Sequence, residues 1–197
     1  MNLPNKLTVL RILLVPFFVA SLLIPFPHHY LVSCLLFIMA SVTDCLDGKL
    51  ARKRNLVTDF GKFADPLADK ILVISAFVCF IALGITDPVM VIIVLIREFT
   101  VTSIRLVAAS QGKVVAANIW GKVKTVSQII AICAVMFSSY ILELMDLNII
   151  SVSSEVYQQF SSGFMVMDQI FLWVSTIFAV ISGVIYVMDN RHVIQDW

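Results

Sequence analysis

The sequence contains few charged residues, since Asp, Glu, Lys and Arg make up 14% of its 197 residues while 60% are hydrophobic. Soluble domains contain about 25% charged residues. This shortage, together with a mean hydropathy of +0.97, excludes an ordinary soluble domain and indicates an integral membrane protein. Neither sign of charge is in excess, because the formal net charge is +1. The composition therefore indicates no polyanionic partner such as a nucleic acid.

Paired cysteines, repeats and low-complexity tracts are also absent. The four cysteines form no C-x-x-C pair and lie in or beside apolar runs, so we expect reduced, buried thiols and not a metal or redox motif. A long polar domain is lacking as well. We therefore expect residues 1–197 to form a single membrane domain.

Apolar runs account for most of the chain. About 20 apolar residues are needed to cross the ~30 Å hydrocarbon core of a bilayer. The second and third runs have only 14 residues each, and they become long enough only if their helices continue into the polar segment between them. We expect an all-α membrane protein with six transmembrane helices. The runs are Leu7–Ile24, Tyr30–Thr43, Ile71–Gly84, Val89–Ala109, Ile119–Leu142 and Ile170–Met188.

Basic residues are missing from every second connection between these runs. Pro25–His29, Ile85–Pro88 and Glu143–Gln169 contain none of the 14 Lys and Arg residues. The positive-inside rule therefore predicts that the other connections and both termini are cytoplasmic. The longest polar stretch, Asp146–Ser162, is predicted to be a loop on the opposite side, with at most a short interfacial helix.

Four aspartates lie between the second and third runs. Asp44 and Asp47 are three residues apart, and Asp65 and Asp69 are four apart, so each pair shares a helix face if the segments are helical. Crowded carboxylates repel one another, and two divalent cations would neutralise four of them. All the donors are hard oxygens, which favours Mg²⁺ or Mn²⁺ over zinc. On these residues alone, an enzyme and a divalent-cation transporter both remain open.

The aspartates belong to a longer pattern, D-x-x-D-G-x-x-A-R-x8-G-x-x-x-D-x-x-x-D. Its glycines, Gly48 and Gly61, lack side chains where a bulky ligand must approach the backbone, and Ala51 is small for a related reason. Arg52 carries a planar guanidinium that suits phosphate oxygens. The pattern resembles, position by position, the signature of the CDP-alcohol phosphotransferase family.

This resemblance implies a transferase with two divalent cations and a CDP-linked lipid donor, CDP-diacylglycerol. An acceptor hydroxyl attacks the β-phosphorus and CMP leaves. The resemblance also implies that all four aspartates are metal ligands and that Asp69, in addition, takes the proton of the hydroxyl as the catalytic base. The predicted CDP-binding residues are Asn5, Thr8, Asp44, Gly48, Ala51, Arg52 and Gly61.

Polar residues recur every third position near the start of the chain. Asn5, Thr8 and Arg11 follow this spacing, so one side of the first helix could face the nucleotide. A local interpretation needs only an N-cap and an arginine at the membrane interface. Both interpretations remain open at this point.

Four basic residues lie in or beside the fourth and fifth runs. Arg97 and Arg105 are eight residues apart, broadly on one helix face, and Lys122 and Lys124 open the fifth run. A cation inside a membrane helix needs a partner or a wet cavity, and a dianionic phosphate would serve all four. The alternative is that Arg97 pairs with Glu98 or an aspartate and that the lysines only mark topology.

Three further stretches, Asn2–Arg11, Gly121–Thr125 and Ser182–Tyr186, resemble bacterial members of the family whose acceptor is sn-glycerol 3-phosphate. This resemblance implies that the four cations hold the acceptor phosphate and that the product is phosphatidylglycerophosphate. It also implies a homodimer in the bacterial inner membrane, with its active site facing the cytoplasm. Another acceptor, such as serine, inositol phosphate or phosphatidylglycerol, is the nearest alternative, and a transporter is a remote one.

Overall fold

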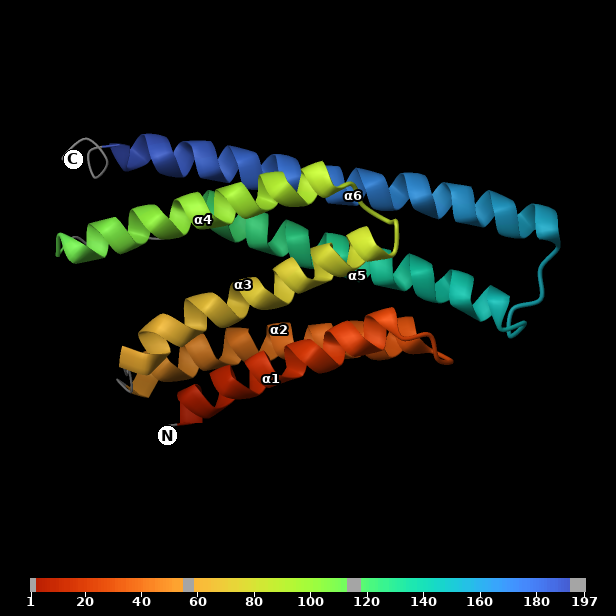
Figure 1. Cartoon of the computed structure of the whole chain (residues 1–197), viewed down its shortest axis with the longest axis horizontal. Helices are drawn as coiled ribbons and strands as arrows, with labels where there is room; N and C mark the ends of the chain where they lie inside the picture. The colour runs from red at the N-terminus through yellow and green to blue at the C-terminus, as the bar shows by residue number, and fades with distance from the viewer. Residues whose placement is uncertain (1–2, 55–58, 113–117, 192–197) are drawn as a thin grey trace.

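The computed structural model describes residues 3–54, 59–112 and 118–191, with the side chains of residues 8–43, 70–112 and 118–191. Over this part the chain forms six α-helices and no strand (Figure 1). The all-α fold predicted from the sequence is therefore confirmed. The helices are α1 (Leu3–Leu23), α2 (His29–Arg54), α3 (Asp59–Ala82), α4 (Pro88–Ser110), α5 (Ile119–Asp146) and α6 (Ser154–Asp189).

The helices lie side by side along the long axis of the molecule, and successive helices reverse direction (Figure 1). Helix α1 packs against α2 and α3, while α5 and α4 both pack along α6, and α2 contacts α5. The ends of α2, α4 and α6 therefore lie at the same end of the bundle as the starts of α1, α3 and α5. We call this the motif end, because α2 ends and α3 begins there.

Helices α2 and α3 both continue beyond their apolar runs, as predicted. Helix α2 extends to Arg54 and α3 begins at Asp59, so the aspartate pattern lies on helical backbone on both sides of the connection. In the sequence, the apolar run of α2 ends at Thr43 and that of α3 begins at Ile71. The two helices thus project their polar ends from the apolar part of the bundle.

Two helices of the described part, α5 and α6, are long and apolar enough to cross a membrane, judged by length and composition. Within the described residues, the apolar stretches of α1, α2 and α3 are shorter, and α4 contains three charged residues. Six helices are thus confirmed, while six spans and the side of the termini stay predictions. Large hydrophobic side chains are exposed on all six helices, a surface more typical of lipid contact than of contact with water.

The polar stretch after α5 is where the sequence-based prediction was wrong. A loop was predicted over Asp146–Ser162, but only residues 147–153 separate α5 from α6. Ser153 caps α6, since its Oγ accepts a hydrogen bond from the Val156 N–H at 3.4 Å. The Glu, Gln and Met residues that follow are polar or flexible but are good helix formers. The 36 residues of α6 span about 54 Å, more than a hydrocarbon core requires.

A tightly packed apolar core holds the helices together on the side away from the motif end. Phe18 of α1 and Phe37 of α2 have ring centroids 5.7 Å apart. Glu143 on α5 closes this end, because its carboxylate accepts from the backbone N–H groups of His29 at 3.0 Å and Tyr30 at 3.4 Å. Those N–H groups have no partner within α2. Other fully buried core residues are Phe77, Phe80, Met90, Ile132, Met136 and Leu172.

Candidate active site

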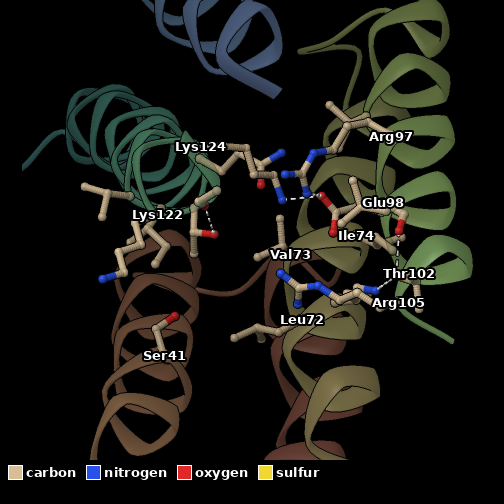
Figure 2. Close-up of a pocket in the computed structure, with 18 of the residues that line it drawn as sticks. Ser41, Leu72, Val73, Ile74, Arg97, Glu98, Thr102, Arg105, Lys122 and Lys124 are labelled. Atoms are coloured by element: carbon tan, nitrogen blue, oxygen red, sulfur yellow. Dashed lines mark hydrogen bonds and ion pairs between the residues drawn. The ribbon is translucent and has the colours of Figure 1, made fainter. Parts of the chain in front are cut away.

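A cavity of about 830 Å³ lies among α1–α5, toward the motif end. This volume is within the usual range for small-molecule sites. Residues of α3 contribute an apolar wall, and residues of α4 and α5 contribute charged side chains (Figure 2). Among the described residues, six cations and one carboxylate line the cavity. They are Arg11, Lys70, Arg97, Arg105, Lys122, Lys124 and Glu98.

Glu98 lies between two of the predicted phosphate-binding cations. Its Oε1 accepts from Arg97 Nη1 at 2.9 Å and forms an ion pair with Lys124 Nζ (Figure 2). All three side chains are at most 10% exposed, so water screens these charges weakly. The pairing of Arg97 with Glu98, raised above as an alternative, is thus observed. Two cations share one carboxylate in this Glu98 cluster, which therefore keeps a net positive charge.

Arg97 is also held by α6. Its Nη2 donates to Ser182 Oγ at 2.6 Å. The next residue is Gly183, where an added Cβ would lie 2.8 Å from Arg97 Cγ, so the close approach of α4 and α6 requires glycine. Arg97 Nε is buried and has no partner within the described part of the chain. The guanidinium is therefore held at both of its terminal nitrogens, while its Nε–H has no partner among the described residues.

Arg105 lies eight residues further along α4, nearer the motif end, and is exposed. Its Nε donates to the Tyr186 hydroxyl at 3.2 Å, and its Cζ lies 5.4 Å from the centroid of that ring. This is within the range of a cation–π contact. Because Tyr186 is only 3% exposed, it provides a firm support for a guanidinium that lines the mouth of the cavity.

The two lysines predicted to bind phosphate differ in their surroundings. Lys124 is 6% exposed and belongs to the Glu98 cluster, so it is not a surface marker of topology. Lys122 is exposed and lies apart from that cluster in Figure 2. The structure thus brings all four predicted cations to one cavity, with Arg97 and Lys124 inside and Arg105 and Lys122 toward solvent.

A hydrogen-bonded chain links α3 to the Glu98 cluster. Lys70 Nζ donates to Thr102 Oγ1, and this hydroxyl in turn donates to the backbone oxygen of Glu98 at 2.6 Å. Both Lys70 and Thr102 line the cavity. The start of the apolar part of α3 is therefore tied to the helix that carries the arginines.

The aspartate pattern borders this cavity along the backbone. Lys70 and Ser41 line the cavity, while Asp69 directly precedes Lys70 and Asp44 follows Ser41 by one turn. Consecutive Cα atoms are about 3.8 Å apart, so the residues of the pattern that are nearest in sequence to Ser41 and Lys70 lie close to the cavity wall. The backbone places Asp44, Asp47, Gly48, Ala51 and Arg52 on α2 and Gly61, Asp65 and Asp69 on α3, but their side chains, like that of Asn5, lie outside the described residues.

Two residues of α1 are buried more deeply than expected. Thr8 and Arg11 are each 1% exposed, and Arg11 lines the cavity. Of the two interpretations of this stretch, the burial of Arg11 in the cavity wall favours the one in which this side of α1 faces the interior of the bundle. The physical reason is that α1 packs against both α2 and α3, which covers this face. Asn5 lies within α1, which already includes Leu3, so it is not the N-cap of that helix.

The sequence profile of the CDP-alcohol phosphatidyltransferase family matches residues 1–181. The chain belongs to this family. A Bacillus subtilis (strain 168) protein named CDP-diacylglycerol--glycerol-3-phosphate 3-phosphatidyltransferase is 41% identical over 206 residues, covering 98% of this chain and 97% of that protein. A protein of the same name from Rickettsia bellii (strain RML369-C) is 32% identical, and the alignment covers 94% of this chain and 93% of that protein. Another, from Wigglesworthia glossinidia brevipalpis, is 37% identical, and the alignment covers 78% of this chain and 87% of that protein.

In this CDP-alcohol phosphatidyltransferase, several groups around the arginines were not predicted as site residues. Ser182 and Tyr186 on α6 lie just beyond the matched segment and contact Arg97 and Arg105. Gln128 on α5 lines the cavity and is 1% exposed. A signal was present, because Ser182 and Tyr186 are polar residues four apart in an apolar run and so share one face of the helix.

Proposed function

We propose that this CDP-alcohol phosphatidyltransferase transfers the phosphatidyl group of CDP-diacylglycerol to sn-glycerol 3-phosphate, yielding phosphatidylglycerophosphate and CMP. The observation that carries this proposal is the cation-lined cavity beside the aspartate-bearing helices. A phosphate dianion matches the excess of cations over carboxylates in this lining, whereas serine has no net charge and would leave that excess unneutralised. The names of the similar proteins favour glycerol 3-phosphate over inositol phosphate and phosphatidylglycerol.

The acceptor phosphate is bound, in this proposal, by Arg97, Arg105, Lys122 and Lys124. Charge-assisted hydrogen bonds from guanidinium and ammonium groups to phosphate are stronger than neutral ones. The contact of Arg97 with Ser182 and that of Arg105 with Tyr186 hold the two guanidinium groups before the acceptor arrives. This reduces the conformational entropy that binding must remove.

The chemical step forms one oxygen–phosphorus bond and breaks another. The primary hydroxyl oxygen of the acceptor bonds to the β-phosphorus of CDP-diacylglycerol, while the bond from that phosphorus to the bridging oxygen breaks. CMP leaves with the bridging oxygen. We propose that the Asp69 carboxylate takes the hydroxyl proton, for which its backbone position beside the cavity-lining Lys70 is suitable.

Divalent cations suit the residues of the aspartate pattern. Carboxylate oxygens are hard donors of the kind that Mg²⁺ and Mn²⁺ prefer, and α2 and α3 each carry a pair of them one turn apart. We propose that Asp44, Asp47, Asp65 and Asp69 hold two such ions. When bound, the ions would neutralise the charge of the diphosphate and stabilise the attacking and leaving oxygens.

The nucleotide half of the donor is proposed to lie along the same helices. Arg52 is suited to a phosphate oxygen, and small residues leave space for the nucleotide near the backbone. Thr8, which is buried on α1, is a candidate contact from the other side. The full proposed set is Asn5, Thr8, Asp44, Gly48, Ala51, Arg52 and Gly61.

We further propose that the enzyme lies in the bacterial inner membrane as a homodimer, with the cavity open to the cytoplasm. The distribution of basic residues supports this orientation, because the connections at the other end of the bundle contain none. Such an orientation would give a soluble acceptor and a lipid donor access to the same cavity.

A panel of acceptor alcohols tests the reaction directly. We expect the purified protein in detergent to release CMP from CDP-diacylglycerol with glycerol 3-phosphate, and far more slowly with serine or inositol phosphate. Chelation by EDTA should stop the release, and Mg²⁺ or Mn²⁺ should restore it. Fast release with serine would contradict the proposed acceptor. Divalent-ion uptake into proteoliposomes without CMP release would favour the transporter instead.

Replacing Gly183 with Ala should weaken acceptor use. The new Cβ would lie 2.8 Å from Arg97 Cγ, so Arg97 must shift, which disturbs its contact with Ser182 and its position in the cavity wall. We expect kcat/KM for glycerol 3-phosphate to fall about tenfold, which corresponds to an overpacking cost of about 1.4 kcal/mol.

Gly163 on the same helix provides the matched control, because a Cβ there would meet nothing within 4 Å. Gly163→Ala should leave kcat/KM within about twofold of wild type, as expected for a helix position with open space around it. An equal loss in both variants would show that the effect comes from α6 in general and not from the displacement of Arg97.

A further inference from the structure

Gln128 has no role in the function proposed so far, although both polar atoms of its side chain are buried in the cavity wall. It lies on α5, is 1% exposed and lines the cavity. Neither its Nε2 nor its Oε1 has a hydrogen-bond partner in the described part of the chain. Buried amides are almost always hydrogen bonded, because an unpaired one loses its bonds to water without replacement. A partner that enters the cavity would account for its presence.

The position of Gln128 identifies the part of a guest that it would meet. It follows Lys124 by four residues, so the two side chains share a helix face with Cβ atoms about 5–6 Å apart. Lys124 belongs to the positively charged Glu98 cluster, and Gln128 lies one turn further from the motif end. A small molecule whose phosphate binds the cluster, and whose reacting group points to the aspartates, would therefore offer Gln128 a group that does not react.

We propose that Gln128 binds the free secondary hydroxyl of sn-glycerol 3-phosphate and thereby makes the cavity selective for this acceptor. The inference rests on the proposed function, since it assumes that the acceptor phosphate occupies the cationic part of the cavity. Gln128 is then a specificity-determining residue that contacts the acceptor but takes no part in proton transfer.

The chemistry of the amide suits this role. A hydroxyl group both donates and accepts a hydrogen bond, and the glutamine amide offers one group of each kind. The amide is also neutral, so it adds no competitor for the phosphate beside the cations. Binding of the acceptor would supply the missing partners of both amide atoms. An analogue without the hydroxyl would leave them unpaired, which is how a buried polar group rejects the wrong substrate.

The test compares glycerol 3-phosphate with 3-hydroxypropyl phosphate, which has the reacting hydroxyl and the phosphate but lacks the secondary hydroxyl. CMP release gives kcat/KM for each acceptor, with wild type and with Gln128→Met, which has a similar length and no amide. We expect wild type to prefer glycerol 3-phosphate about tenfold or more. In Gln128→Met the preference should fall to within about threefold, through a loss with glycerol 3-phosphate alone.

Several results would overturn the inference. Equal use of the two acceptors by wild type would do so without any variant, as would a parallel fall of both values in Gln128→Met. Absence of CMP release by wild type with either acceptor would instead reject the proposed function, and this inference with it. Ser127→Ala is the control, because the Ser127 hydroxyl bonds the backbone oxygen of Lys124 at 2.8 Å within the same helix; the acceptor preference should not change.

Thermal unfolding provides a readout that is independent of turnover. Without acceptor, the melting temperature of Gln128→Met in detergent should equal or exceed that of wild type, because the change removes an amide that lacks partners. Glycerol 3-phosphate should then raise the melting temperature of wild type more than that of the variant. A lower melting temperature of the variant without acceptor would show that the amide serves the fold, and would overturn the proposal.

Discussion

Asp69→Asn is expected to lower the rate of CMP release by at least about three orders of magnitude. A general base alone contributes about 10²–10⁴-fold, and this substitution also weakens a proposed metal ligand. Asparagine has nearly the same shape, and helix α3 begins ten residues earlier, at Asp59, so we expect the variant to fold. The measurement is the release of labelled CMP from CDP-diacylglycerol in detergent, with size-exclusion chromatography to monitor folding.

Glu155→Gln is the matched control for this loss. Glu155 is exposed in the first turn of α6, at the end of the bundle opposite the motif end, so removal of its charge should leave turnover unchanged. Unimpaired turnover in Asp69→Asn would remove this residue from the mechanism. Recovery of turnover at high Mn²⁺ would limit its role to metal binding, whereas a loss that Mn²⁺ does not reverse would support the transfer of the hydroxyl proton to Asp69.

The second large effect concerns the acceptor. Arg105→Ala should raise the apparent KM for glycerol 3-phosphate about 30-fold, as expected for the loss of about 2 kcal/mol from hydrogen bonds to a charged group. Arg105 lines the mouth of the cavity, where Tyr186 supports it through a 3.2 Å hydrogen bond and the face of its ring. Steady-state kinetics with each substrate varied in turn would measure both KM values.

The apparent KM for CDP-diacylglycerol should change much less in the same variant. An equal rise in both values would argue against a role in binding the acceptor phosphate. Arg191 provides a comparison, because it is also exposed but lies beyond the end of α6 and does not line the cavity. Arg191→Ala should therefore leave both KM values close to those of wild type.

Local sequence patterns predicted the helices wherever an apolar run and a cap agreed. The fourth run, Val89–Ala109, became α4 with one more residue at each end, because Asp87 caps the helix and Pro88 suits its first turn. The start of α6 was missed because polarity was interpreted as a loop, whereas helix propensity and the Ser153 cap decided the structure. A run of polar residues indicates exposure to water, and an exposed helix has polar residues as readily as a loop does.

The candidate site was predictable where it depends on charge, since a cation inside an apolar run needs a partner or a water-filled cavity. This argument found Arg97, Arg105 and Lys124, which the structure brings to one cavity. It did not find Gln128, and it missed Ser182 although the spacing of the polar residues Ser182 and Tyr186 was a signal. What each of these residues contacts depends on how α4, α5 and α6 are rotated against one another, and that register is a property of the packed bundle.

Glu98 gives the cavity an internal counter-ion. Its carboxylate forms ion pairs with Arg97 and Lys124, and all three side chains are buried, so most of the water around these cations is already removed when the protein folds. An entering phosphate then exchanges with an anion that is present beforehand, which moderates the strength with which it is held. This matters for release, because the proposed product keeps the same phosphate and must separate from the same cations in every turnover.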